Sequence, residues 1–219
     1  MITVEKHVAV MINGFKTNVY IVTDVETGVT AVIDPSLPEK ELLRKLEGKN
    51  VQYIFFTHGH SDHSSGARMV KENTGAKTVI HKVEEEMFHD IYKNEFHVNC
   101  NLLEVDFPDV EIDILTDDGE EFMIGNTKLT VMHTPGHSMG SVCYLFKEDK
   151  IMFTGDTLFK LNAGRADFYG GDARTELMSL AKIGEIEGDY KVYPGHEEET
   201  TLDFERQNNR YMKTRFRKR

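Results

Sequence analysis

The chain has 219 residues, a formal net charge of −11 at pH 7 and a hydrophobic content of 39%. This length fits one domain with its own core, and the negative charge argues against general nucleic-acid binding. Because no apolar stretch reaches about 18 residues and the first residues include Glu5 and Lys6, we expect neither a membrane span nor a signal peptide. Cys100 and Cys143 are too few for a disulfide framework, so we expect free thiols and a cytoplasmic location.

The first half of the chain is predicted to open with an antiparallel sheet and to continue with helices and strands in alternation. Apolar, β-branched runs bounded by turn residues such as Asn13-Gly14 predict strands at 2–10, 18–23, 29–33, 51–56 and 77–81. Helical spacing of apolar residues predicts helices at 38–48, from a cap at Ser64 or Ser65 to about 74, and at 83–96.

The second half returns to strands and ends in helices. Strands are predicted at 110–115, 120–124, 128–133, 141–146, 150–153 and 191–193, and helices at 174–186 and 197–209. The order is therefore strands, helices, strands and helices, in two similar halves without a visible sequence repeat.

One short segment concentrates metal-binding residue types. It reads T-H-G-H-S-D-H-S-S-G over residues 57–66 and directly follows the predicted strand 51–56. Side chains alternate along extended backbone, so His58 and His60 point the same way and can hold one ion. Asp62 and His63 lie past the turn, which favours a second ion. Imidazole and carboxylate ligands suit zinc, iron or manganese.

Three further candidate ligands stand at predicted strand ends, each directly after a glycine: His137, Asp156 and His196. Glycine lets the backbone turn sharply and approach a site closely. Asp34 also ends an apolar strand. It is interpreted either as a turn former before Pro35 or as a residue that orients a metal ligand, and the sequence leaves both open.

The order of Asp34, the His-x-His-x-Asp-His run, His137, Asp156 and His196 resembles the metallo-β-lactamase fold superfamily of hydrolases over nearly the whole chain. The resemblance implies an α/β fold, a four-layer αββα sandwich with mixed sheets, over residues 1–205. Residues 206–219 are rich in arginine and lysine and are expected to form a basic C-terminal tail. By position, the resemblance implies His58, His60 and His137 at one ion, Asp62, His63 and His196 at the second, and Asp156 bridging both.

This ligand set is typical of the glyoxalase II-like branch, and residues 154–159 and 164–168 are similar to its short bacterial members. The resemblance implies two divalent ions, zinc first, with iron or manganese as alternatives. It further implies a hydrolase that cleaves a small-molecule thioester of the S-lactoylglutathione (hydroxyacylglutathione) type with water activated at the metals. Asp62 would orient the nucleophile or shuttle a proton in addition to binding metal.

Two residues are candidates for substrate contacts. Arg165 lies on the loop where glyoxalase II-like enzymes carry a basic residue for the carboxylate of the thiol carrier, and a salt bridge to Asp167 or Asp172 is the alternative. Tyr169 is a second candidate, with packing as its alternative. His81 and His133 are interpreted as core or supporting residues rather than ligands.

Several alternatives remain open at this stage. A persulfide dioxygenase of the same fold would hold a single iron on His58, His137 and Asp156, and would leave the other ligands idle. The remaining alternatives are a hydrolase that cleaves a lactone or a phosphoester and a metal-binding module without enzymatic activity. Because 23 residues follow His196, we expect no counterpart of the C-terminal helical domain of longer glyoxalase II enzymes, which puts glutathione itself in question as the carrier. The oligomeric state is not predicted.

Overall fold

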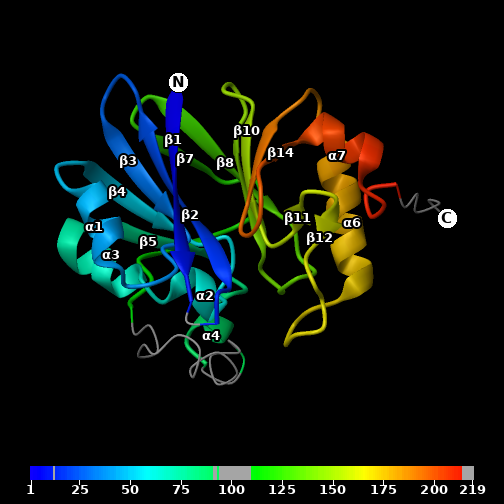
Figure 1. Ribbon diagram of the computed structural model, residues 1–219, viewed down its shortest axis with the longest axis horizontal. Coiled ribbons are helices and arrows are strands. Elements are labelled where there is room, and N and C mark those ends of the chain that lie inside the picture. Colours follow the sequence, from blue (N-terminus) through cyan, green and yellow to red (C-terminus); the bar gives the residue numbers. More distant parts are fainter. Residues whose placement is uncertain (12, 91–92, 94–109, 214–219) are drawn as a thin grey trace.

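Two six-stranded mixed sheets form the centre of the molecule (Figure 1). The computed structural model describes residues 1–11, 13–90, 93 and 110–213. The first sheet contains β1 (Ile2–Val10), β2 (Lys16–Asp24), β3 (Val29–Ile33), β4 (Asn50–Phe55), β5 (Lys77–His81) and β6 (Ile114–Thr116), in that spatial order. Its first three strands are antiparallel, and β3 to β6 run parallel.

The second sheet is antiparallel except for one pair. It contains β7 (Glu121–Ile124), β8 (Thr127–His133), β9 (Val142–Phe146), β10 (Ile151–Gly155), β13 (Lys191–Pro194) and β14 (Thr200–Thr201), in the order β14-β13-β10-β9-β8-β7. Strands β10 and β13 are parallel. A small hairpin of β11 (Leu158–Phe159) and β12 (Asn162–Ala163) follows β10.

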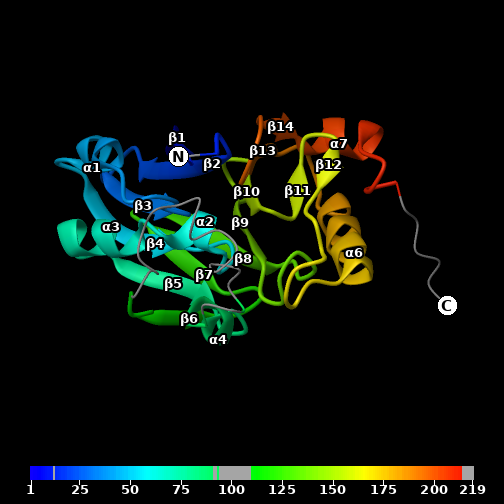
Figure 2. The ribbon, with the colours of Figure 1, turned by 60° about the horizontal axis from the view of Figure 1, so that its bottom comes forward.

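Helices cover the outer face of each sheet (Figures 1 and 2). α1 (Lys40–Leu46) and α3 (Ala67–Thr74) lie on the first sheet, and α6 (Ala173–Gly184) and α7 (Leu202–Asn208) on the second. The short helices α2 (Ser61–Ser64) and α4 (Glu85–Phe88) lie near one edge of the sandwich. None of the described helices has the length and apolar character needed to cross a membrane.

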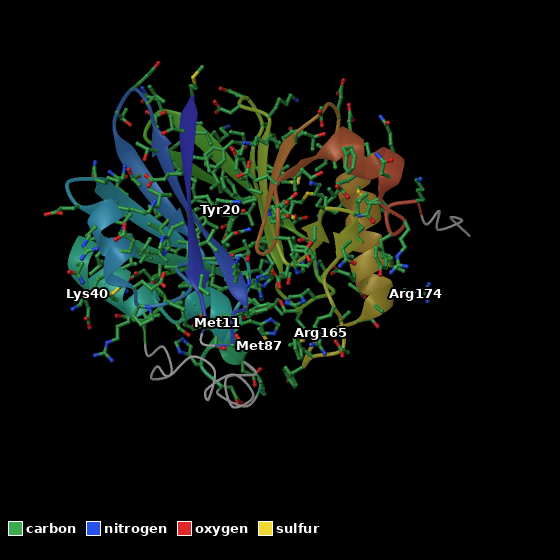
Figure 3. The ribbon with its side chains drawn as sticks, viewed as in Figure 1. Met11, Tyr20, Lys40, Met87, Arg165 and Arg174 are labelled. Carbon is green, nitrogen blue, oxygen red and sulfur yellow. The ribbon has the colours of Figure 1, made fainter. Side chains whose placement is uncertain are left out.

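Three hydrophobic cores fill the spaces between these layers. Ile54 of β4 packs with Leu42 and Val70 beneath α1 and α3, whereas the adjacent Phe55 joins the core between the two sheets. This alternation along one strand buries both faces of the sheet. Tyr20, which Figure 3 labels near the middle of the molecule, belongs to the same inter-sheet core. The third core lies beneath α6 and α7. The predicted four-layer αββα sandwich is confirmed.

The predicted helix after the histidine segment is two helices, α2 and α3, and the cap of α3 is Gly66 rather than Ser64 or Ser65. The Gly66 amide donates to the carbonyls of Pro35 and Ser36 at 2.8 and 2.9 Å. A Cβ on Gly66 would lie 2.4 Å from the Pro35 carbonyl oxygen, so this close approach requires glycine.

Other element boundaries also differ from the prediction. The helix predicted at 83–96 ends at Phe88 in α4, and the Asp90 side chain accepts from the Lys93 amide instead. Of that predicted helix, residues 91–92 and 94–96 fall outside the described residues, as does Cys100. β6 covers only the end of the strand predicted at 110–115.

The C-terminal helix begins later than predicted. Within residues 197–209, Thr200 pairs with Val192 as part of β14, and α7 starts at Leu202 with Thr201 as its cap. The boundary predicted at 206 falls inside α7, where Arg206 Nε donates to the Gly184 carbonyl at 3.0 Å. Residues 214–219 lie outside the described part.

Candidate metal centre

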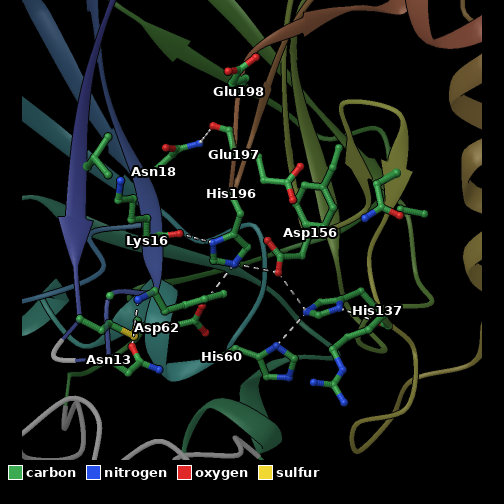
Figure 4. A pocket seen from close by; sticks show the side chains of 18 of the residues that line it. Asn13, Lys16, Asn18, His60, Asp62, His137, Asp156, His196, Glu197 and Glu198 are labelled. Atoms are coloured by element: carbon green, nitrogen blue, oxygen red, sulfur yellow. Dashed lines mark hydrogen bonds and ion pairs between the residues drawn. The ribbon is translucent and has the colours of Figure 1, made fainter. Parts of the chain in front are cut away.

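All the predicted ligands follow the carboxyl ends of strands, at one edge of the sandwich. Residues 58–63 follow β4, His137 follows β8, Asp156 follows β10 and His196 follows β13. A cavity of about 820 Å³ opens at this edge. His60, Asp62, His137, Asp156 and His196 converge in it, as Figure 4 shows.

Three buried histidines form one possible set of ligands, called here the first trio: His58, His60 and His137. One ring nitrogen from each lies within 4.8 Å of the others. His60 Nδ1 and His137 Nε2 are 2.9 Å apart. The first trio therefore joins the loop after β4 in the first sheet to the loop after β8 in the second.

Asp62, His63 and His196 form a second set, called here the second trio. His63 Nε2 and His196 Nε2 are 3.2 Å apart, and Asp62 Oδ2 lies 3.4 Å from each. Like the first trio, the second takes its members from both sheets.

Asp156 lies between the two trios. Its Oδ1 is 3.3 Å from His63 Nε2, and its Oδ2 is 3.2 Å from His196 Nε2 and 3.6 Å from His137 Nε2. Asp156 also forms a close group with His58 and His63, so the two trios share one continuous cluster.

The donor atoms fit metal ions. Ligand atoms about 2.0–2.2 Å from one tetrahedral ion lie about 3.3–3.6 Å apart, close to the separations within this cluster. Two buried atoms of the cluster, His58 Nε2 and Asp156 Oδ1, have no hydrogen-bond partner among the described residues. Since buried polar atoms are normally satisfied, these atoms need a partner that the side chains do not supply.

Hydrogen bonds to the remaining ring nitrogens orient four of the histidines. His63 Nδ1 donates to Asp34 Oδ2 at 3.0 Å. His58 Nδ1 donates to Thr57 Oγ1, and this hydroxyl donates to Asp34 Oδ2 at 2.6 Å.

Backbone carbonyls orient the other two histidines. The Arg165 carbonyl accepts from His137 Nδ1 at 2.7 Å, and the Lys16 carbonyl accepts from His196 Nδ1 at 2.6 Å. In each case the Nε2 atom is turned towards the cluster.

Asp34, whose two interpretations were open, therefore orients candidate ligands in addition to making a turn. Its φ of 51° is unusual for a residue other than glycine, and its Oδ1 accepts from the Thr57 amide at 2.8 Å. This strained residue is held by the same hydrogen bonds that fix His63 and Thr57.

Burial and neighbouring charges divide the histidines into two kinds. Burial lowers the pKa of His58 and of His60, the latter to about 3, so both imidazoles are neutral. Burial also acts on His63 and His196, but the carboxylates of Asp62 and Asp156 outweigh it and raise both pKa values, that of His196 to about 10. Burial alone would raise the pKa of Asp62 and of Asp156, but the nearby His63 and His196 hold both pKa values well below the usual range.

The two substrate candidates lie in different surroundings. Arg165 lines the cavity, and its guanidinium makes two hydrogen bonds to Asp167, at 2.6 and 2.7 Å, while lying 4.0 Å from the Phe168 ring centre. Asp172 instead caps α6. Tyr169 is 43% exposed, with Lys93 Nζ 5.5 Å from its ring centre. Arg165 appears in Figure 3 at the same end of the molecule as Met11, which also lines the cavity.

The β1–β2 turn and the start of β2 contribute residues that the sequence did not identify. Phe15 lies 4.6 Å from the His196 ring, and Asn18 Nδ2 donates to the carbonyls of Pro194 and Glu197 at 2.9 and 3.1 Å. Asn13-Gly14 marked the turn, but only the pairing of the two sheets brings it against His196. The rings of His81 and His133 stack with their centres 4.1 Å apart. Neither histidine belongs to the groups of possible metal ligands found among the described residues.

Comparisons with known proteins agree with this geometry. Residues 12–196 match the model of the metallo-beta-lactamase superfamily. Curated proteins called hydroxyacylglutathione hydrolase are 32% identical over 180 residues in Pelagibacter ubique (strain HTCC1062) and 34% identical over 178 residues in Brucella anthropi. Each match covers 81% of this chain, and the chain spans 65% and 60% of these relatives. An uncharacterized protein of Mycobacterium leprae is 31% identical, over 92% of this chain and 98% of its own length.

Solved structures share the architecture. The B3 metallo-beta-lactamase BLEG-1 matches with a TM-score of 0.84 and 27% identity, over 98% of this chain and all of its own. The protein TTHA1623, solved in a di-iron-bound form, matches with a TM-score of 0.79 and 26% identity, over 92% of this chain and 98% of its own. With two facing sheets, flanking helices and a matched domain over most of its length, the chain belongs to the metallo-beta-lactamase superfamily.

Proposed function

We propose that this protein is a metal-dependent hydrolase that cleaves a thioester of the hydroxyacylglutathione type. The observation that carries the proposal is the convergence of seven donor residues as two trios joined by Asp156. The similarity to relatives called hydroxyacylglutathione hydrolase supports the choice of a thioester.

In this proposal the first trio holds one divalent ion, the second trio holds the other, and Asp156 binds both. The bound ions would polarise the scissile carbonyl and lower the pKa of a water molecule. Zinc is the first choice for these nitrogen and oxygen donors, with iron or manganese as alternatives.

We assign to Asp62 the role of acting on the attacking water. Its side chain borders the cavity and is 13% exposed, and the charges of His63 and His196 hold the pKa of its carboxyl low against the effect of burial. Asp62 is therefore ionised at neutral pH, and an ionised carboxylate accepts a hydrogen bond. In this role Asp62 orients the water towards the carbonyl carbon, and a thiolate leaves without requiring a proton donor.

The cavity also offers surfaces for the two ends of a thioester. Phe15, Phe159 and Phe168 provide apolar walls for an acyl or thiol chain, and Arg165 provides a cation that a carboxylate can share with Asp167. These features support a small-molecule substrate with an anionic group.

Hydrolysis of S-lactoylglutathione by the zinc-reconstituted protein tests this function. We expect loss of the thioester absorbance, and we expect a chelator to abolish it. If zinc binds but no thioester is cleaved, a mononuclear-iron persulfide dioxygenase or a lactone or phosphoester hydrolase takes its place. The dioxygenase would need only His58, His137 and Asp156, and the close geometry of the second trio argues against it.

A further inference from the structure

Glu84 is a buried carboxylate close to the candidate metal ligands. Among the described residues, it makes no hydrogen bond to the side chain of any of these ligands. It directly precedes α4, follows the carboxyl end of β5, and has 0% exposure. The described part of the chain gives it no lysine, arginine or histidine as an ion-pair partner. Burying an ionisable group in this way is costly unless hydrogen bonds compensate for the lost water.

Three donors converge on this carboxylate from the two loops that carry the first trio. Glu84 Oε2 accepts from the Gly59 amide at 3.0 Å. Glu84 Oε1 accepts from Ser138 Oγ at 2.5 Å and from the Gly140 amide at 2.6 Å. Ser138 Oγ also lies 2.6 Å from Ser141 Oγ, which extends the connection along the second loop.

The position of these donors in the chain gives the carboxylate its significance. Gly59 lies between His58 and His60, and Ser138 directly follows His137. One carboxylate therefore joins the backbone of the loop after β4, in the first sheet, to the loop after β8, in the second. The distances between the histidines of the first trio depend on how these two loops sit against each other.

The two glycines show how closely the loops pack on Glu84. A Cβ on Gly59 would lie 3.0 Å from Glu84 Oε2, and a Cβ on Gly140 would lie 2.5 Å from Glu84 Cγ. No side chain therefore separates either loop from the carboxylate. A shift of Glu84 would be transmitted directly to both loops.

We propose that Glu84 is a positioning residue that sets the geometry of the first trio by clamping its two loops together. This inference rests on the proposed metal centre but not on the identity of the substrate. Both oxygens are required because a carboxylate is only an acceptor, whereas a glutamine amide would point an N–H group at one of the three donors.

The test measures zinc affinity of Glu84→Gln by competition with a chromophoric chelator. His196→Ala provides the background, because it disrupts the second trio and leaves the first trio to hold the remaining ion. In this background we expect Glu84→Gln to weaken zinc binding about 10- to 100-fold, the range for residues that orient metal ligands. In a His58→Ala background, which leaves the second trio, we expect a change below about threefold.

Glu205→Gln is the matched control. Glu205 is also 0% exposed and also accepts three hydrogen bonds, from Thr200 Oγ1, the Leu161 amide and Asn209 Nδ2, but none comes from a ligand loop. We expect it to lower the melting temperature of the metal-free protein as Glu84→Gln does, without changing zinc affinity in the His196→Ala background.

Equal zinc affinity of Glu84→Gln and Glu205→Gln in that background would overturn the inference and leave Glu84 a purely structural residue. If Glu84→Gln does not fold, Ser138→Ala replaces it, since it removes one of the three donors; we expect zinc binding about fivefold weaker, and no change would overturn the inference. Because the readout is zinc affinity, absence of thioester hydrolysis would count against the proposed function and not against the position of Glu84.

Discussion

Histidines of the second trio lie against two carboxylates, Asp62 and Asp156, whereas those of the first trio lie mainly against other imidazoles. Around His58 the burial of the ring and the neighbouring histidines lower its pKa, so a neutral ligand is ready for metal. His63 Nε2 and His196 Nε2 each lie 3.4 Å from Asp62 Oδ2, and both also lie close to the Asp156 carboxylate. The two carboxylates raise the pKa of both histidines despite burial. In the absence of metal, protons therefore occupy the place of a cation in the second trio.

Zinc binding should consequently release protons, mainly from His63 and His196. At pH 7 we expect about two protons to be released as both sites fill, and about one fewer in His196→Ala. Calorimetric titrations in buffers of different ionisation enthalpy measure this number. A heat of binding that is independent of the buffer would contradict the protonated state of these histidines.

Among the elements, the loop between β12 and α6 has two separate connections to the site. The Arg165 carbonyl orients His137, whereas its guanidinium pairs with Asp167 on the exposed side of the cavity. A substitution of the side chain leaves the backbone hydrogen bond in place, so the two connections can be separated by experiment.

Arg165→Ala should raise KM several-fold with little effect on kcat, because the arginine would bind the substrate without touching the reacting atoms. Asp167→Ala is the matched control: it removes the carboxylate that competes with the substrate for the guanidinium, so KM should stay equal or fall. Steady-state kinetics with S-lactoylglutathione provides the comparison. Unchanged KM in Arg165→Ala, or loss of folding, would assign the arginine to the salt bridge alone.

Strands β5 and β8 end in a stacked pair of histidines away from the ligand trios. His81 is 1% exposed and stacks on His133 at 4.1 Å. Burial, followed by the charge of His133, lowers the pKa of His81 to about 4, although Asp117 opposes this. His81 is therefore neutral in the folded protein at pH values where an unfolded histidine takes up a proton.

Because the folded-state pKa of His81 is depressed, its contribution to stability is present above about pH 6.5 and is lost as the pH falls towards 4. His81→Phe keeps an aromatic ring against His133 but cannot titrate. In this variant the free energy of unfolding should fall less steeply with decreasing pH, by a slope that corresponds to up to about one proton. Urea unfolding of the metal-free protein across this range measures the slope. The same slope in both proteins would show that His81 does not titrate in this way.

For the whole molecule, the proposed metal centre is a junction between its halves. Both trios and Asp156 combine loops from the two sheets, which otherwise meet mainly through the apolar inter-sheet core. Metal binding should therefore stabilise the entire sandwich rather than one loop.

Zinc should raise the melting temperature by about 10 °C for each ion bound, as expected for a ligand about a thousandfold above its Kd in a chain of this size. Asp156→Ala removes the residue shared by both sites and should abolish most of this increase together with hydrolysis. Thermal unfolding with and without a chelator provides the measurement. A fully active Asp156→Ala variant with the normal increase would refute the bridging role.

Location in the cytoplasm and the absence of nucleic-acid partners stay predictions from charge and composition.

The sequence by itself determined the fold class and the candidate ligands, because these depend on local signals. Strand periodicity, and a glycine before His137, Asp156 and His196, can be recognised within a few residues, and their order is typical of one superfamily. Helix limits were less well predicted: α4 ends at Phe88, where the Asp90 side chain competes for the backbone, and Gly66 divides one predicted helix into two.

Only the tertiary structure decided what holds those ligands in place. The Lys16 carbonyl accepts from His196 across 180 positions of sequence, and Glu84 connects loops 25 and 54 residues away. Such hydrogen bonds involve backbone atoms or common residue types, which leave no local pattern to recognise. They form because the two sheets stack and bring the carboxyl ends of their strands to one edge, and that edge is where the candidate metal ligands lie.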